Sequence, residues 1–111
     1  MNIEELISAI RKRPGMFVQD KRLDYIKYFI TGFYCHGFVS KTVAVVDTHF
    51  SEEFHRWVKG WIKNNLGINF EEEHGWYEYI AASTKSNEEA FELFFRLTDE
   101  FFREFHQFDK N

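Results

Sequence analysis

The stretch NEEAFELFFRLTDEFFREFHQF, residues 87–108, decides the fold of this chain. Ser86 or Asn87 can cap a helix here, and Glu88 and Glu89 would lie in its first turn, where carboxylates face the positive end of the helix dipole. A wide, mostly apolar stripe follows at spacings of three and four: Ala90, Phe91, Phe94, Phe95, Thr98, Phe101, Phe102, Phe105 and Phe108. One neighbouring helix cannot cover such a stripe, so we expect the central helix of the core, buried on two sides.

Working outward from this helix, three further segments show helical periodicity. Residues 3–13 follow a capping box made by Asn2 and Glu5. This helix must stop near Arg13, and a tight Pro-Gly turn should follow. A second helix is expected from about residue 23, capped by Asp20 and stopped by Gly37. A third should start at Ser51 and end at Gly67.

Two short segments are ambiguous between strand and helix. Residues 42–46 are β-branched and apolar, which suits either a buried strand or a piece of helix. Residues 76–82 also fit both the helical and the strand period, although we favour a short helix in this region. The predicted fold class is therefore mainly α: a compact bundle of four to five helices, with a short β element as the alternative in these two places. Residues 1–111 are expected to form a single domain.

Composition excludes several classes of protein. No apolar run approaches the ~20 residues that span a bilayer, and the acidic N-terminus is unlike a secretory signal, so a cytoplasmic protein is expected. Cys35, the single cysteine, should be buried and structural. The net charge is +2 over residues 1–50 and −6 over residues 51–111, which disfavours direct contact with nucleic acid.

Signatures of catalysis are missing from the sequence. The glycines are dispersed and form no phosphate loop, so nucleotide hydrolysis by that route is not expected. No histidine pair has the spacing of a metal site, and His49 and His55 should lie on different sides of one helix. Adjacent helical positions separate Cys35 from His36, which disfavours a nucleophile and base. We predict no catalytic residue, no cofactor, no metal and no enzymatic activity.

One segment has the composition of a protein interface. Amphipathic aromatic rings stand beside acidic groups at Glu71, Glu72, Glu73, Trp76, Tyr77 and Glu78, and we predict these six residues as a partner-binding site. The alternative is that the aromatic residues belong to the core and the glutamates form a solvated surface.

A resemblance to known families rests on the opening motif. The phrase RKRPGMF, residues 11–17, is similar to a phrase in the ATPase subunits of type II topoisomerases, but the helix after it has no asparagine and the adenine-binding glycine loop is missing, so we reject that activity. The chain more closely resembles small bacterial proteins with an N-terminal Arg-Pro-Gly-Met-Tyr/Phe motif. The corresponding segments here are RPGMF at 13–17, residues 23–33, FHRWV at 54–58, residues 76–80 and residues 90–101.

Some of those proteins resemble immunity proteins of the contact-dependent growth inhibition type. The resemblance implies a non-catalytic domain that binds and neutralises a cognate toxin, with no membrane or cofactor involved. If the toxin is a nuclease, its basic cleft would attract residues 71–73 and the acidic face of the terminal helix. The alternative is a small homodimeric structural or regulatory domain that associates through exposed phenylalanines of that helix.

Overall fold

The computed structural model describes residues 1–17, 21–40 and 44–109, and within these ranges the regular structure is entirely helical. The helices in chain order are α1 (Ile3–Lys12), α2 (Pro14–Phe17), α3 (Leu23–Ser40), α4 (Val45–Leu66), α5 (Trp76–Ala82) and α6 (Asn87–Asp109). The predicted mainly α bundle is confirmed, with five helices longer than one turn and the short α2 as an addition. Residues 76–82 are helical, which settles one of the two ambiguous segments.

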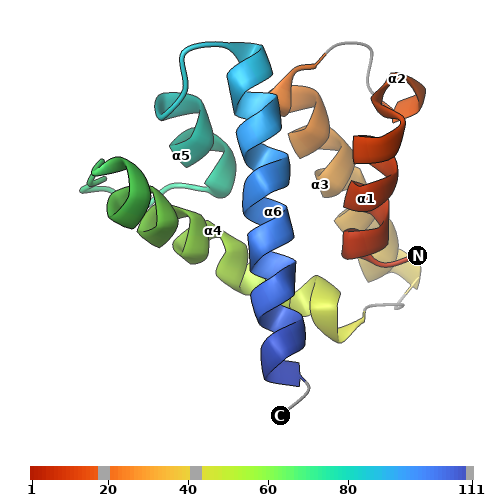
Figure 1. Ribbon diagram of the computed structural model, residues 1–111. Helices are drawn as coiled ribbons and strands as arrows, with labels where there is room; N and C mark the ends of the chain where they lie inside the picture. The colour runs from red at the N-terminus through yellow and green to blue at the C-terminus, as the bar shows by residue number, and fades with distance from the viewer. Residues whose placement is uncertain (18–20, 41–43, 110–111) are drawn as a thin grey trace.

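Helix α6 lies at the centre of the fold. Figure 1 shows it running the length of the molecule, with α4 crossing behind it, α5 on one side and α1 on the other. It packs against α1, α3, α4 and α5. Buried positions on its stripe include Phe91, Phe94, Phe95, Phe101 and Phe102, whereas the side chain of Phe108 lies outside the described part of the chain. The expectation of a central helix buried on two sides is confirmed.

The overall dimensions agree with a folded domain. The Cα radius of gyration is 13.9 Å, close to the value of about 13 Å expected for a domain of this length. None of the described helices is both long enough and apolar enough to cross a membrane.

Helix α1 forms as its sequence predicts, because both bonds of the capping box are made. Asn2 Oδ1 accepts from the Glu5 amide at 2.8 Å, and Glu5 Oε1 accepts from the Asn2 amide at 3.0 Å. The helix ends at Lys12, but the predicted tight turn after it is wrong: Pro14 opens the short helix α2. Proline suits a first helical position, where its missing amide hydrogen costs no bond.

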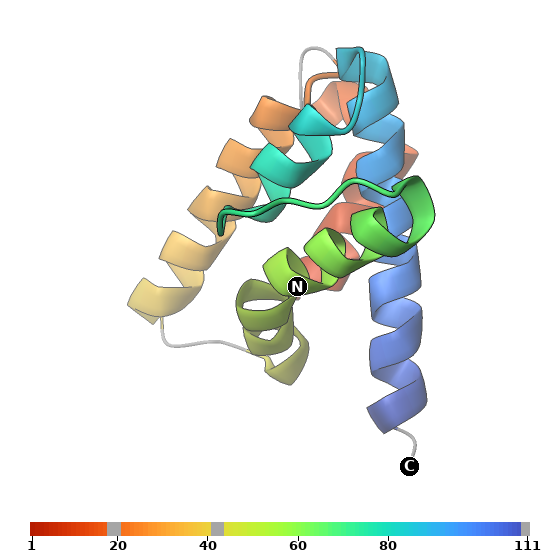
Figure 2. The ribbon, with the colours of Figure 1, turned by 90° about the vertical axis from the view of Figure 1, so that its left-hand side faces the viewer.

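Helix α3 is longer than predicted. It starts at Leu23, near the expected position, whereas its expected cap, Asp20, lies outside the described residues. It continues through Gly37 to Ser40, so the predicted stop is wrong: glycine tolerates the helical backbone at a cost of about 1 kcal/mol. Figure 2 shows the C-terminal end of α3 at the periphery of the molecule. Cys35 lies on this part of α3 and is exposed, which corrects the expectation of a buried cysteine.

Helix α4 begins at Val45, six residues before the predicted start at Ser51. Of the ambiguous segment 42–46, residues 42 and 43 lie outside the described residues, and residues 45 and 46 belong to α4. The group that stabilises this start is Asp47, whose Oδ2 accepts from the Ala44 amide at 3.2 Å. The N-cap position is Ala44, which has no capping side chain, so the sequence shows only half of the capping-box pattern that marks α1.

Asp47 also joins α4 to α1. The carboxylate is only 3% exposed, and its Oδ1 accepts from the Ile3 amide at 2.7 Å. The Tyr34 hydroxyl donates to the Asp47 main-chain oxygen at 2.7 Å. Burial, and then the charge of Asp47, raises the pKa of Tyr34 above its ordinary value, so the phenol keeps the proton that it donates. One buried residue therefore fixes the N-termini of two helices and contacts a third.

The end of α4 yields a paired prediction. Gly67 follows the helix with φ of 71°, a left-handed conformation that other residues adopt only with strain, whereas Gly60 lies inside the helix. A Cβ would meet no atom within 4 Å at either position. Gly67→Ala should therefore lower the free energy of unfolding by about 1 kcal/mol, and Gly60→Ala should raise it by about 0.5–1 kcal/mol. Urea denaturation of both variants measures the two changes, and a shift of the same sign in both would contradict this account.

Candidate functional site

A pocket of about 570 Å³ opens where α4 crosses α6. Its lining comes from one face of each helix: His49, Glu53, Arg56 and Trp57 from α4, and Phe101, Glu104 and Phe105 from α6. The α4 residues recur at spacings of three and four, which brings them onto one side of the helix. We call this hollow the α4–α6 pocket.

The floor of the α4–α6 pocket is aromatic. The His49 ring stacks on the buried Phe101 ring at 5.1 Å, with 22° between their planes, and lies 5.1 Å from the Phe105 ring. The Trp57 ring meets Phe101 edge to face, at 5.6 Å and 81°. Trp57, His49 and Phe105 are half-buried, so each combines core packing with a face that reaches the surface. The pocket therefore offers apolar, π-rich surface at its base.

Charged groups form the rim of the pocket. Trp57 Nε1 donates a hydrogen bond to Glu104 Oε2, which ties the two helices together across the pocket. Arg56 lies 3.7 Å from Glu53, and its side chain is 82% exposed. Two carboxylates and one guanidinium give the rim a formal net charge of −1 around the aromatic floor. Such a site favours a cationic ligand over an anionic one.

The predicted acidic residues lie elsewhere, on the loop between α4 and α5. The side chains of Glu72 and Glu73 are 85% and 92% exposed, and Glu71 is exposed beside them. Glu73 lies 3.4 Å from Lys59, and Glu72 lies 3.7 Å from His74. Ion pairs this exposed contribute little to stability, so the glutamates are available to a partner.

Tyr79, a buried residue of α5, holds the acidic loop at residues 71–73 in place. This residue is 1% exposed, and its hydroxyl accepts from the His74 amide at 2.7 Å and donates to the Glu72 carbonyl at 3.5 Å. Its ring lies 4.9 Å from that of Phe70. Three contacts along the loop fix the backbone that carries the glutamates, which reduces the entropy lost when a partner binds.

Trp76 is a core residue and is not part of the exposed surface. It is 6% exposed, and its ring lies 4.9 Å from Phe94 and 6.0 Å from Phe54. Its amide donates to His55 Nδ1 at 2.8 Å. Trp76, one of the six predicted partner-binding residues, therefore belongs to the core.

Tyr77 and Glu78 lie beside Lys27 of α3. Lys27 Nζ is 4.7 Å from the centre of the half-buried Tyr77 ring and 3.7 Å from Glu78 Oε1. The negative charge of Glu78 is therefore partly compensated at the surface. The structure keeps these two residues accessible, but in a mixed-charge environment.

The histidines lie in separate environments, as predicted for His49 and His55. His49 faces α6, whereas His55 faces the start of α5. Burial lowers the pKa of His55, a shift that the nearby Glu78 opposes, and its Nδ1 accepts a bond, so the ring has a structural role in its neutral form. Among the described residues, no three His, Cys, Asp or Glu side chains are grouped to hold a metal ion.

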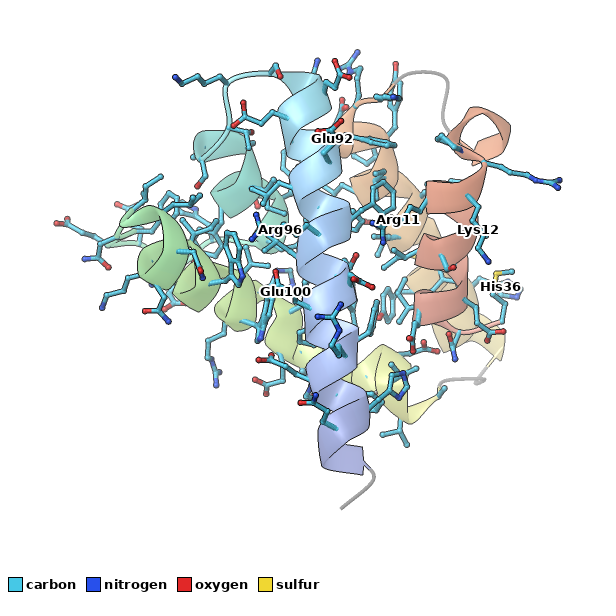
Figure 3. The ribbon with its side chains drawn as sticks, viewed as in Figure 1. Arg11, Lys12, His36, Glu92, Arg96 and Glu100 are labelled. Carbon is cyan, nitrogen blue, oxygen red and sulfur yellow. The ribbon has the colours of Figure 1, made fainter. Side chains whose placement is uncertain are left out.

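The surface side chains of α6 carry charges of both signs. Figure 3 shows Glu92, Arg96 and Glu100 in succession along this helix. Arg96 Nε lies 3.6 Å from Glu100 Oε2, and Arg103 lies 2.9 Å from Asp99. The expected acidic face is therefore interrupted by arginines that pair within the helix, and the loop at residues 71–73 is the more concentrated acidic surface.

The α4–α6 pocket was not predicted from the sequence. His49, Glu53 and Trp57 share a face of α4, a signal visible in the spacing alone. The helix predicted from Ser51 does not include His49, and the crossing with α6, which leaves the rings partly uncovered, is a tertiary property. No protein-family model, curated protein or solved structure matches this chain.

Proposed function

We propose that this chain is a non-catalytic binding protein, an immunity protein that neutralises a cognate bacterial toxin by direct contact in the manner of contact-dependent growth inhibition systems. The observation that supports it best is the exposed loop Glu71–Glu73, fixed on the fold by the buried Tyr79. A rigid acidic surface on a small scaffold attracts a basic partner and orients it on approach.

A nuclease toxin would suit this surface. Enzymes that cleave nucleic acid bind phosphates through clustered cations, so an acidic loop can occupy the cleft in place of substrate. Glu71, Glu72 and Glu73 would make the first electrostatic contact, and Tyr77 with Glu78 would extend the footprint. Trp76 is buried and would support this surface from the core.

The homodimer alternative receives less support from the structure. It requires exposed phenylalanines on α6, but Phe91, Phe94, Phe95, Phe101 and Phe102 are buried within one chain. Phe105 is half-buried and lines the α4–α6 pocket. The described phenylalanines of α6 therefore offer no broad self-association surface.

A charge-neutralising variant tests the proposed footprint. Mixed with the toxin domain encoded beside its gene, the protein should form a complex that calorimetry detects. Because the loop acts through charge, the triple variant Glu71→Gln/Glu72→Gln/Glu73→Gln should raise Kd by about tenfold or more at low salt, and the difference should shrink as salt increases.

The matched control removes the same charge elsewhere. Glu52→Gln/Glu88→Gln/Glu92→Gln neutralises three exposed glutamates on α4 and α6 and should change Kd less than about threefold. Absence of any complex with the toxin domain would overturn the proposed function. A complex that the loop variant and the control weaken equally would place the footprint elsewhere.

A further inference from the structure

The α4–α6 pocket combines features that recognise one kind of ligand. Its aromatic floor presents π-faces, which attract cations, and its rim places Glu53 and Glu104 on opposite helices. A planar guanidinium suits such a site best, because it stacks on rings and donates hydrogen bonds to carboxylates at its edges at the same time. An ammonium ion is more strongly hydrated and cannot stack in this way.

The protein already contains this arrangement one helical turn away. The Arg96 guanidinium lies 5.1 Å from the Trp61 ring and pairs with Glu100 at 3.6 Å. Figure 3 shows Arg96 and Glu100 on the side of α6 toward α4. Trp57 precedes Trp61 by one turn of α4, and Glu104 follows Glu100 by one turn of α6. The aromatic ring and the carboxylate are thus repeated at the pocket.

At the pocket, α6 supplies no arginine to complete the repeat. Arg96 lies one turn before Glu100 on α6. The residue one turn before Glu104 is Glu100, a glutamate. The rim cation is Arg56, whose side chain is 82% exposed and lies 3.7 Å from Glu53. An exposed pair of this kind is weak and can be displaced.

We propose that the α4–α6 pocket receives the guanidinium of an arginine side chain presented by the partner protein. Its plane lies on the aromatic floor, and Glu53 and Glu104 accept its hydrogen bonds. The identity of the partner as a basic toxin rests on the proposed function, whereas the chemistry of the pocket does not. The site is a second point of contact, separate in the sequence from the acidic loop.

Short capped peptides test the pocket without any toxin. The probe is acetyl-Gly-Arg-Gly-amide, and the matched control replaces arginine by citrulline, which has nearly the same shape and no charge. Binding is followed by NMR through the indole N–H of Trp57. We expect the arginine peptide to bind with a Kd on the order of 1 mM, which is typical of a single small group, and the citrulline peptide to bind at least about tenfold more weakly.

Three variants locate the site. Glu53→Gln and Glu104→Gln should each weaken binding of the arginine peptide by about threefold or more, because each removes a carboxylate and keeps a hydrogen-bond acceptor. Arg56→Ala should strengthen binding by about threefold, because it removes a competing guanidinium from Glu53. The matched control, Arg103→Ala, removes an arginine that pairs with Asp99 outside the pocket lining and should leave affinity within about twofold.

Specific outcomes would overturn the proposal. Equal binding of the arginine and citrulline peptides, or tighter binding of a phenylalanine peptide, would show an apolar site instead of a cation site. Unchanged affinity in both glutamine variants would place the peptide outside the pocket. If the peptide binds but no toxin complex forms, the proposed function is refuted and the arginine site is retained. If a toxin complex forms but the peptide does not bind, the arginine site is refuted and the proposed function is retained.

Discussion

Asp47→Ala is expected to lower the free energy of unfolding by about 3 kcal/mol, a large fraction of the stability of a domain of this size. The carboxylate is 3% exposed and accepts from the amides of Ile3, the first residue of α1, and Ala44, the N-cap of α4. Each bond to a charged acceptor contributes about 1.5–3 kcal/mol, and alanine would leave the buried Ile3 amide without a partner. The negative charge also lies at the positive ends of two helix dipoles.

Two comparison variants separate these contributions. Asn2→Ala removes a cap of α1 at the surface and should cost about 1 kcal/mol. Asp47→Asn keeps the shape of the side chain but turns a donor toward one of the amides, so an intermediate loss of about 2 kcal/mol is expected. Urea denaturation followed by circular dichroism measures all three. If Asp47→Ala costs no more than Asn2→Ala, Asp47 caps one helix only.

Phe54→Ala is expected to have the largest effect on stability, a loss of about 4 kcal/mol. Phe54 is fully buried on α4, where it meets α5 and more than one turn of α6. Among the described residues, five rings lie within 6.3 Å of its own: Phe50, Trp57, Trp76, Phe94 and Phe101. Alanine would leave a cavity that rigid aromatic neighbours fill poorly, so the cost should be near the upper end for such substitutions.

Calorimetric unfolding of graded variants tests this role. Phe54→Leu keeps most of the volume and should cost about 1.5 kcal/mol. Tyr28→Ala removes an aromatic ring that is 66% exposed on α3, and its effect should stay within about 0.5 kcal/mol. If Phe54→Ala proves too unstable to purify, the leucine variant still decides the question: a loss no larger than that of Tyr28→Ala would contradict the central position of this ring.

Periodic apolar spacing made α1 and α6 predictable from sequence, since the pattern in each matches one helix period over several turns. The start of α4 was not predictable in the same way. Its N-cap is Ala44, which has no capping side chain, and the group that bonds the Ala44 amide, Asp47, lies three residues later within the helix. The second bond of Asp47, to Ile3 44 residues away, exists only in the folded chain. The predicted end of α3 at Gly37 is wrong because a glycine ends a helix only where the backbone adopts a left-handed conformation, as it does at Gly67.

The candidate sites likewise include residues that the sequence predicts and residues that only the folded structure identifies. The exposure of Glu71, Glu72 and Glu73 followed from their run of like charge. Trp76 could be assigned either to the core or to an interface, because its spacing from Tyr79 and Ile80 fits both. Its contact with the Phe94 ring places it in the core. The α4–α6 pocket needed the angle at which two helices cross, which periodicity does not contain.

The central position of α6 has a consequence for how the chain is made. Of the described helices it is the last to leave the ribosome, yet α1, α3, α4 and α5 all pack against it. Until residues 87–109 have been synthesised, the apolar faces of the earlier helices have no common surface to cover them. The nascent chain therefore completes its core only after α6 is made, and the shorter chain before it is the form most prone to aggregate and to engage chaperones.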